Sequence, residues 1–319
     1  MSEPFISVII TAHNRQEFLR GAVQSVIDQD LPPDNFEIII VKNFPDTVLD
    51  SMNSPRFHVV NVGVTNVGKS LLVGISKSRG KVISFLDDDD RFDVTKLKEI
   101  YSLFSNRKTL VYYHNYQRVV NQDGDLISNH GGPFSGEFEA SDFIDNLKSI
   151  SRKYSSREIY FNLSSCAIRK DTLMGYLDKL RKITGHTDDF FFYAALDSKG
   201  LLIFDSKPLT IYRNHRSTSK INKGRLTMRT LSRERAELYR NQAFSSSLIL
   251  DMLTDPSLRR YVATQKVKEE ILLTHYSTQN HADCVSHRFK SILGLLRYDF
   301  GSYTARVIRI CYYLFISIF

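Results

Sequence analysis

Short apolar runs of strand length recur along the first part of the chain, and segments with helical spacing of apolar residues separate them. The runs that we expect to form strands are Phe5–Ala12, Phe36–Val41, His58–Val62, Lys81–Leu86 and Leu110–Gln117. Between the first two runs, apolar residues recur at helical spacing from Phe18 to Ile27. This alternation predicts an α/β fold, in which helices flank a mostly parallel, Rossmann-like sheet.

The pattern changes near Lys220–Arg225, and from Leu226 onward it is helical without clear strands. We therefore expect a first domain over residues 1–222 and an α-helical C-terminal region over residues 223–319. The last stretch, Ile310–Phe319, is apolar apart from one serine and follows several arginines and tyrosines. It is too short to span a bilayer, and the sequence leaves three roles open: docking on an anionic membrane surface, packing on the core, or a dimer contact.

Composition narrows the class of protein. The 319 residues are 42% hydrophobic and 24% charged, which is typical of a globular protein. The three cysteines, Cys166, Cys284 and Cys311, are too far apart for a disulfide scaffold or a CxxC zinc site. Together with an N-terminus that lacks the pattern of a signal peptide, they lead us to expect a cytoplasmic location, with attachment to the inner face of the membrane as the alternative.

The net charge of +8 allows a nucleic acid, a membrane surface or a phosphorylated ligand as partner. No arrangement of basic and aromatic residues favours nucleic acid, so we do not expect that partner. A homo-oligomer is compatible with the sequence.

The strongest chemical feature is the run Phe85–Asp90, in which four aspartates end an apolar strand. In α/β sheets, ligands bind at the carboxyl ends of the strands. Alternation along a strand would point Asp87 and Asp89 to the same side. Two carboxylates placed in this way suit a divalent cation that is bridged to a diphosphate. The alternative is a solvated acidic turn that begins the next helix.

Four segments, in order along the chain, resemble motifs of the family 2 inverting glycosyltransferases, which have the GT-A fold. SVIITAHNRQEFL (Ser7–Leu19) resembles the opening strand with its nucleotide-binding turn, and Asn61–Asp90 resembles the segment that leads into the DxD motif. HTDDFFFYAAL (His186–Leu196) resembles the motif of the catalytic base, and YRNHRSTS (Tyr212–Ser219) the late histidine motif. The resemblance covers about residues 4–220.

The resemblance implies a GT-A-like catalytic domain that moves a sugar from a nucleoside-diphosphate sugar to a hydroxyl of a glycan, polysaccharide or lipid-linked acceptor. It implies a Mn²⁺ or Mg²⁺ ion held by Asp89, Asp87 and His215. It also implies that Asp189 is the general base and that Asp188 fills the position before it. The residues that would line the donor nucleotide are Thr11, Ala12, Asn14, Arg15, Asn43, Asn66, Lys69, Asp87 and Asp88.

Two of these assignments have a plainer explanation beside them. Thr187, Asp188 and Asp189 are residue types that favour the start of a helix, so the acids could serve as caps as well as catalysts. At the end of the second predicted strand, Lys42 stands where the family commonly has an acid that reads the nucleobase. Asn43 could still pair with a base edge, but a lysine cannot imitate a carboxylate, so the identity of the base stays open.

A second motif competes with the first. Gly63–Ser70 fits the P-loop pattern GxxxxGK[ST], follows a predicted strand and precedes a helix. On that basis the alternative function is a nucleotide-binding NTPase or kinase. Against it, the loop follows the third strand rather than an opening one. A third alternative is a protein that binds a sugar nucleotide without catalysis.

Overall fold

The computed structural model describes residues 3–277, apart from residues 53, 64–65, 129–131 and 215–227. The chain divides into two compact units, Met1–His215 and Arg216–Phe319, and each is described here by itself. His215, the predicted boundary at residue 222 and the apolar stretch Ile310–Phe319 lie outside the described residues.

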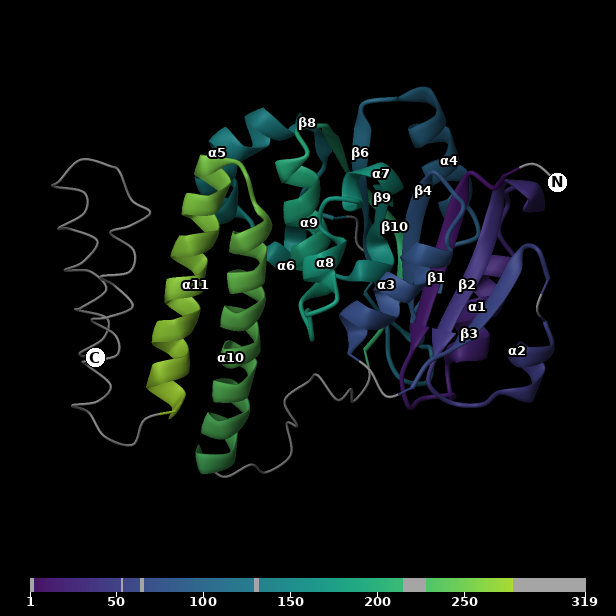
Figure 1. The fold of residues 1–319 in the computed structure, drawn as a ribbon, viewed down its shortest axis with the longest axis horizontal. Helices are drawn as coiled ribbons and strands as arrows, with labels where there is room; N and C mark the ends of the chain where they lie inside the picture. The colour runs from purple at the N-terminus through teal and green to yellow at the C-terminus, as the bar shows by residue number, and fades with distance from the viewer. Residues whose placement is uncertain (1–2, 53, 64–65, 129–131, 215–227, 278–319) are drawn as a thin grey trace, which may run out of the picture. The chain divides into compact units, whose positions relative to one another are not determined.

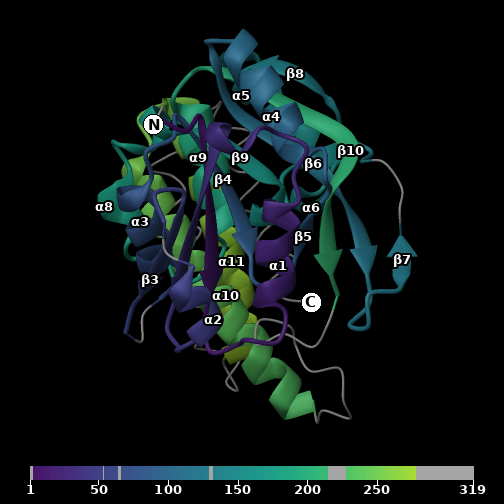
Figure 2. The same cartoon turned by 90° about the vertical axis from the view of Figure 1, so that its right-hand side faces the viewer.

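The first unit is built on one sheet with the strand order β3-β2-β1-β4-β9-β6-β10-β5 (Figures 1 and 2). The strands β3, β2, β1 and β4 run parallel, whereas β9 is antiparallel to both of its neighbours, so that the sheet is mixed beyond β4. The strands are β1 (Ile6–Ala12), β2 (Phe36–Lys42), β3 (Phe57–Asn61), β4 (Val82–Asp87), β5 (Arg91–Phe92), β6 (Leu110–Val120), β7 (Leu126–Ser128), β8 (Gly136–Glu139), β9 (Cys166–Arg169) and β10 (Leu201–Arg213).

Helices cover both faces of this sheet. On one face, α1 and α4 share a buried core cluster with the even-numbered residues of β1 and β2. On the other face, Ile9 of β1 contacts α3 at Gly74, and the ring of Phe85 lies 4.4 Å from that of Phe191 on α9. The helices of this unit are α1 (Leu19–Ile27), η1 (Pro33–Asn35), α2 (Thr47–Ser51), α3 (Val67–Lys77), α4 (Lys96–Asn106), α5 (Ala140–Lys153), α6 (Ser156–Ile159), η2 (Leu163–Ser165), α7 (Lys170–Leu173), α8 (Leu177–Leu180) and α9 (Thr187–Asp197).

Burial on both faces explains why β1 and β2 read as continuous apolar runs rather than as an alternating pattern. The strand β10 is one element although Pro208 interrupts its apolar pattern. The register with β6 shifts on either side of Pro208, because a proline cannot donate the ladder hydrogen bond. The turn at Gly124, whose φ is 98°, joins β6 to β7 (Figure 2).

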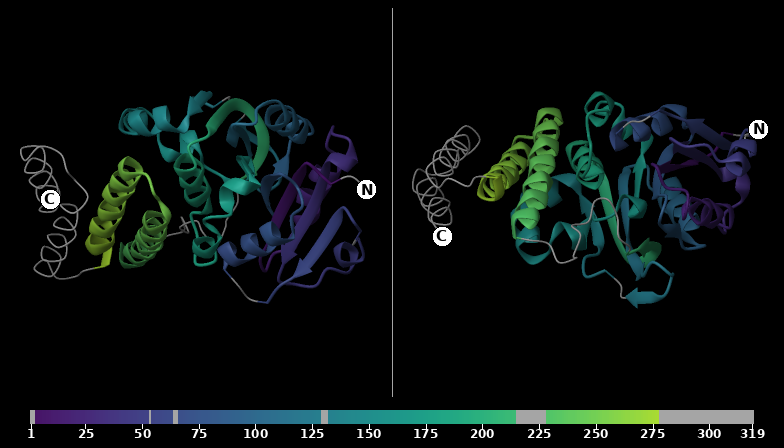
Figure 3. Two further views of the ribbon diagram at one scale, coloured as in Figure 1. Left: turned by 45° about the horizontal axis from the view of Figure 1, so that its top comes forward. Right: turned by 90° about the horizontal axis from the view of Figure 1, so that it is seen from below.

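The described part of the second unit is a pair of helices, α10 (Met228–Met252) and α11 (Pro256–Ser277), which lie side by side and antiparallel (Figures 1 and 3). The rings of Tyr239 and Tyr276 stack between them at 5.7 Å, and the Arg235 guanidinium donates to the Tyr276 hydroxyl at 2.8 Å. Among the described residues, no helix is both long enough and apolar enough to cross a membrane.

Gly68, in the P-loop-like segment, is a packing residue of the fold. The side chain of Asn66 caps α3 by accepting from the amide of Lys69 at 2.8 Å. The amide of Gly68 donates to the carbonyl of Ile183 at 3.1 Å, and a Cβ at Gly68 would lie 2.0 Å from the carbonyl oxygen of Leu180. Only a glycine therefore lets the start of α3 lie against the Leu180–Ile183 backbone.

We expect Gly68→Ala to destabilise the first unit by roughly 1–3 kcal/mol, because the added methyl group collides with backbone. Thermal unfolding would report this as a fall in Tm of several degrees. The matched control is Gly63→Ala in the same segment, since no atom lies within 4 Å of a Cβ at that position. Equal Tm values for the two variants would contradict this account of Gly68.

Candidate active site

The carboxyl ends of β1, β2 and β4 bring several predicted residues to one edge of the sheet. Thr11 is paired in register with Asp87 of β4, and Ala12 with Lys42 of β2. Just beyond them, Asn14 and Asn43 join the loops that follow β1 and β2. The backbone amide of Asn14 donates to Asn43 Oδ1, and Asn43 Nδ2 donates to Asn14 Oδ1, both at 2.8 Å. The backbone of Asn14 has φ 54°, a conformation that asparagine tolerates better than most residues.

Lys42, which departs from the family pattern, is fully buried. Its Nζ lies 2.8 Å from Asp50 Oδ1, and it donates to Asn61 Oδ1 and to the carbonyl of Phe44, both at 2.7 Å. The charge of this ammonium is thus compensated by Asp50 of α2, and its bond to the carbonyl of Phe44 fixes the backbone beside Asn43.

The four aspartates form a turn. The strand β4 ends at Asp87, and the amide of Asp90 donates to the carbonyl of Asp87 at 3.2 Å. The expectation that strand alternation would align Asp87 with Asp89 is therefore wrong in its reason, since Asp89 lies beyond the strand. The turn nevertheless gathers carboxylate oxygens of Asp87, Asp89 and Asp90 within 4.8 Å of one another.

The carboxylates of this turn are costly to ionise where they stand. Burial, and then the charges of the neighbouring aspartates, raise the pKa of Asp87 well above its usual value. Burial raises the pKa of Asp88 to about 6 and that of Asp90 to about 7. Crowded, desolvated carboxylates of this kind are stabilised in their charged form by a nearby cation.

Two arginines contact the acidic turn. The guanidinium of Arg15 forms ion pairs with Asp88 and, at 2.8 Å, with Asp89. The backbone amide of Arg213, at the end of β10, donates to Asp90 Oδ1 at 3.0 Å, and its Nε donates to the carbonyl of Asp89 at 3.3 Å. The YRNHRSTS segment thus reaches the turn through Arg213.

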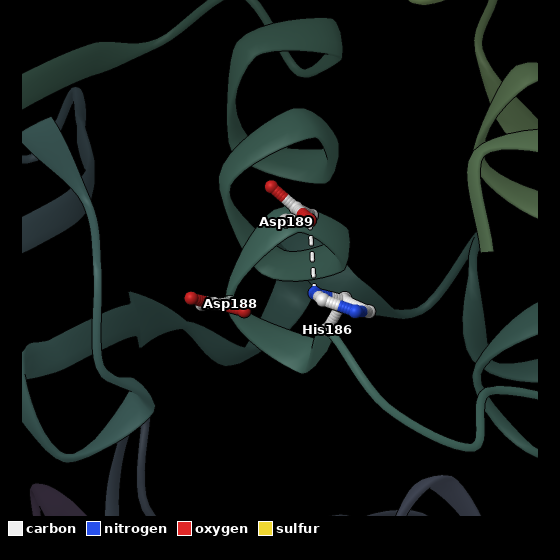
Figure 4. Close-up of side chains that lie close together, drawn as sticks. All are labelled: His186, Asp188 and Asp189. Carbon is white, nitrogen blue, oxygen red and sulfur yellow. Dashed lines mark ion pairs between the residues drawn. The ribbon is translucent and has the colours of Figure 1, made fainter. Parts of the chain in front are cut away.

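A second acidic group lies at the start of α9, where His186, Asp188 and Asp189 come together (Figure 4). His186 Nδ1 lies 3.8 Å from Asp189 Oδ2, and the hydroxyl of Tyr160 donates to Asp189 Oδ1 at 2.7 Å. Burial raises the pKa of Asp188, and the charge of His186 opposes this effect. The Asp188 charge also helps to raise the pKa of Asp87, so the two acidic groups interact electrostatically.

Not every predicted residue joins these groups. Asn66 caps α3, and its Nδ2 donates to the carbonyl of Arg181 at 3.3 Å. Lys69 is exposed. Within the described ranges, no hydrogen bond or ion pair links either residue to the aspartates of the turn or of α9.

Several residues around the site belong to none of the motifs, and the sequence did not predict them as site residues. They are Tyr160, Asn162 and Ser164, which lie before β9, and Lys96 at the start of α4. Lys96 is fully buried, and burial lowers its pKa to about 7. The weak signal in the sequence is that Asn162 and Ser164 are polar residues just ahead of the short apolar run that forms β9.

Comparisons with known proteins agree with this architecture. A structure of S. aureus TarS 1–349 in complex with UDP-GlcNAc superposes with a TM-score of 0.62 at 15% identity and covers 91% of this chain and 81% of that chain. This likeness confirms the GT-A-like α/β fold predicted from the sequence.

An uncharacterized glycosyltransferase of Rickettsia bellii is 32% identical over 140 residues, which cover 41% of this chain and 19% of that protein. The chondroitin synthase of Pasteurella multocida is 26% identical over 132 residues, 40% of this chain and 14% of that protein. The chain therefore spans less than a quarter of the length of these two relatives. The family model described as glycosyl transferase family 2 matches residues 7–171, just over half of the chain. The chain belongs to glycosyl transferase family 2.

Proposed function

We propose that this protein is an inverting, metal-dependent glycosyltransferase that uses a nucleoside-diphosphate sugar as donor. The observation that carries the proposal is the pair of acidic groups at the carboxyl edge of the sheet: one on the turn after β4 and one at the start of α9. Family membership supports sugar transfer, and the TarS structure of the same fold holds UDP-GlcNAc.

The first acidic group suits a divalent cation. Three carboxylates that lie within 4.8 Å of one another form the hard oxygen donor set that Mg²⁺ and Mn²⁺ prefer. Asp87, Asp89 and Asp90 would hold the ion, with His215 as the further ligand that the family resemblance implies. When bound, such an ion neutralises the charge that builds on a departing diphosphate. Arg15 and Arg213 place further positive charge beside the same turn.

The second acidic group suits proton abstraction from the acceptor hydroxyl. The Asp189 side chain is 31% exposed, so that an acceptor can reach it, and one of its oxygens accepts from Tyr160. A carboxylate that removes the hydroxyl proton lets the acceptor oxygen attack the anomeric carbon in one displacement, which inverts its configuration. The acceptor belongs to the class of glycans, polysaccharides or lipid-linked sugars.

The competing P-loop function has less support. Gly68 is needed for contact with the Leu180–Ile183 backbone, and Asn66 for the cap of α3. The packing of α3 thus accounts for these two residues without a phosphate. A protein that binds a sugar nucleotide without catalysis would differ from the proposed enzyme only in that it transfers no sugar.

Replacement of the base should separate chemistry from binding. We expect Asp189→Asn to lower the rate of sugar transfer by about 10²–10⁴-fold, because the amide cannot accept the hydroxyl proton. Donor binding in the presence of Mn²⁺, measured by the ligand-dependent rise in Tm, should be unchanged. Transfer at the wild-type rate by this variant would remove Asp189 from the role of base.

Replacement of a cation ligand should give the opposite result. We expect Asp89→Asn to lose the Mn²⁺-dependent part of donor binding, since a carboxylate ligand is removed. The measurement is a thermal-shift series of nucleotide sugars with and without Mn²⁺. Identical Mn²⁺ dependence in Asp89→Asn and in the wild type would contradict the cation site.

Cation binding should strengthen with rising pH. The cation binds ionised carboxylates, and burial raises the pKa of its ligand Asp90 to about 7. Asp90 holds a proton at about pH 5 and releases it by about pH 8, so the rise in Tm caused by Mn²⁺ should be larger at the higher pH. Asp90→Asn should flatten this dependence, and an equal rise at both pH values in the wild type would contradict the assignment.

A further inference from the structure

We propose that the segment Tyr160–Ser164 is a positioning element that holds the cation site and the general base in a fixed relation to each other. The proposal rests on the function proposed above. Side chains at alternate positions of this segment contact the two acidic groups: Tyr160 contacts α9, whereas Asn162 and Ser164 contact the turn after β4.

Tyr160 orients the base. Its hydroxyl donates to Asp189 Oδ1 at 2.7 Å, and its ring stacks on Phe192 of the same helix at 4.0 Å. Tyr160 is buried, and burial raises the pKa of its hydroxyl far above the usual value, so that it remains a donor. This contact fixes the orientation of the Asp189 carboxylate, whose other oxygen lies 3.8 Å from His186 Nδ1.

Asn162 orients the cation site. Its Nδ2 donates to Asp90 Oδ2 at 2.9 Å, while its Oδ1 accepts from the amide of Ser164 at 3.0 Å. The same residue also acts on the other acidic group, since its backbone amide favours the ionised form of Asp188. Asn162 thus interacts with both acidic groups, with Asp90 through its side chain and with Asp188 through its backbone.

Ser164 completes the connection to β4. Its Oγ accepts from the amide of Asp87 at 3.0 Å, which fixes the backbone at the first aspartate of the turn. The carbonyl of Ser164 in turn accepts from Lys96 Nζ and, at 3.2 Å, from Thr210 Oγ1. Ser164, Lys96 and Thr210 are fully buried.

The backbone of the segment is held in a costly conformation. Asn162 has φ 77° and ψ 110°, outside the regions that residues with a side chain normally adopt. Such conformations persist where the surroundings over-determine them, and they cluster at functional sites. Here the surroundings include His114, whose ring nitrogen Nε2 lies 2.9 Å from the carbonyl of Phe161.

A fixed relation between the two groups matters for the proposed reaction. The acceptor oxygen must be deprotonated and must attack in line with the bond to the diphosphate. Small errors in the relative position of reacting groups are costly in rate. Within the part of the chain that the structure describes, side chains of the Tyr160–Ser164 segment reach both groups, so this segment is suited to set their separation.

The test separates the two arms of the segment. Asn162→Gly removes the amide to Asp90 but tolerates the positive φ, so the backbone can keep its path. We expect it to weaken Mn²⁺ binding in the absence of donor about tenfold, measured by the rise in Tm with Mn²⁺ concentration. Tyr160→Phe should leave Mn²⁺ binding unchanged and lower kcat about tenfold at saturating donor and Mn²⁺.

Matched controls keep stability apart from positioning. Lys199→Gly replaces another residue of positive φ, 61°, at the end of α9. Tyr101→Phe removes the hydroxyl of a tyrosine on α4 whose ring packs on Phe5. Both control variants should keep wild-type Mn²⁺ binding and kcat. In an Asp90→Asn background, Asn162→Gly should have no further effect on Mn²⁺ binding, because the two residues act through one contact.

The outcomes are distinguishable from those that test the function itself. Absence of turnover in the wild type with every donor and acceptor would end the proposed function, while Mn²⁺ binding would still test Asn162. The positioning proposal is overturned if Asn162→Gly binds Mn²⁺ as the wild type does, or if Tyr160→Phe keeps the wild-type kcat. It is also overturned if both variants lose Mn²⁺ binding and kcat alike together with a lowered Tm, since that pattern indicates a merely structural role.

Discussion

The main physical constraint on this structure is the repulsion among the buried carboxylates at the end of β4, which the surrounding residues must offset. Asp88 and Asp90 are almost fully buried, and Asp87 and Asp89 stand beside them. Burial penalises each ionised group, and each charge penalises the others. Part of this cost is offset by Arg15, by the backbone amide of Arg213 and by the side-chain amide of Asn162. The pKa values of Asp88 and Asp90 nevertheless remain raised. Positive charge beside such a turn favours the ionised form of its carboxylates.

The polar core behind the turn is organised around the same constraint. Lys96 is fully buried and stacks over the ring of Phe92 at 4.1 Å, and its pKa falls to about 7 because burial disfavours the charged form. Burial likewise lowers the pKa of His114 to about 3, so this histidine is neutral. Both side chains contact the backbone of residues 161–164: Lys96 Nζ donates to the carbonyl of Ser164, and His114 Nε2 lies 2.9 Å from the carbonyl of Phe161.

The P-loop-like segment shows how one pattern can have two physical causes. A glycine followed by a lysine at the start of a helix is typical of a phosphate cradle, but it also arises where a helix end must approach another backbone. In this protein the second cause applies to Gly68, since the carbonyl oxygen of Leu180 lies only 2.0 Å from where its Cβ would be. The sequence shows the spacing of Gly63–Ser70 but not the distant residues that pack against it.

The sequence by itself determined the alternation of strands and helices, the place of the aspartates after β4 and the acidic start of α9. These features follow from local periodicity and from family motifs that are contiguous in the chain. Only the tertiary structure decided that the turn, rather than strand alternation, gathers Asp87 and Asp89. It also decided that Asn14 pairs with Asn43, and that Tyr160 and Asn162 contact the acidic groups. These contacts join residues that lie far apart in sequence, and no local pattern encodes a hydrogen bond whose partners are brought together by the packing of the sheet.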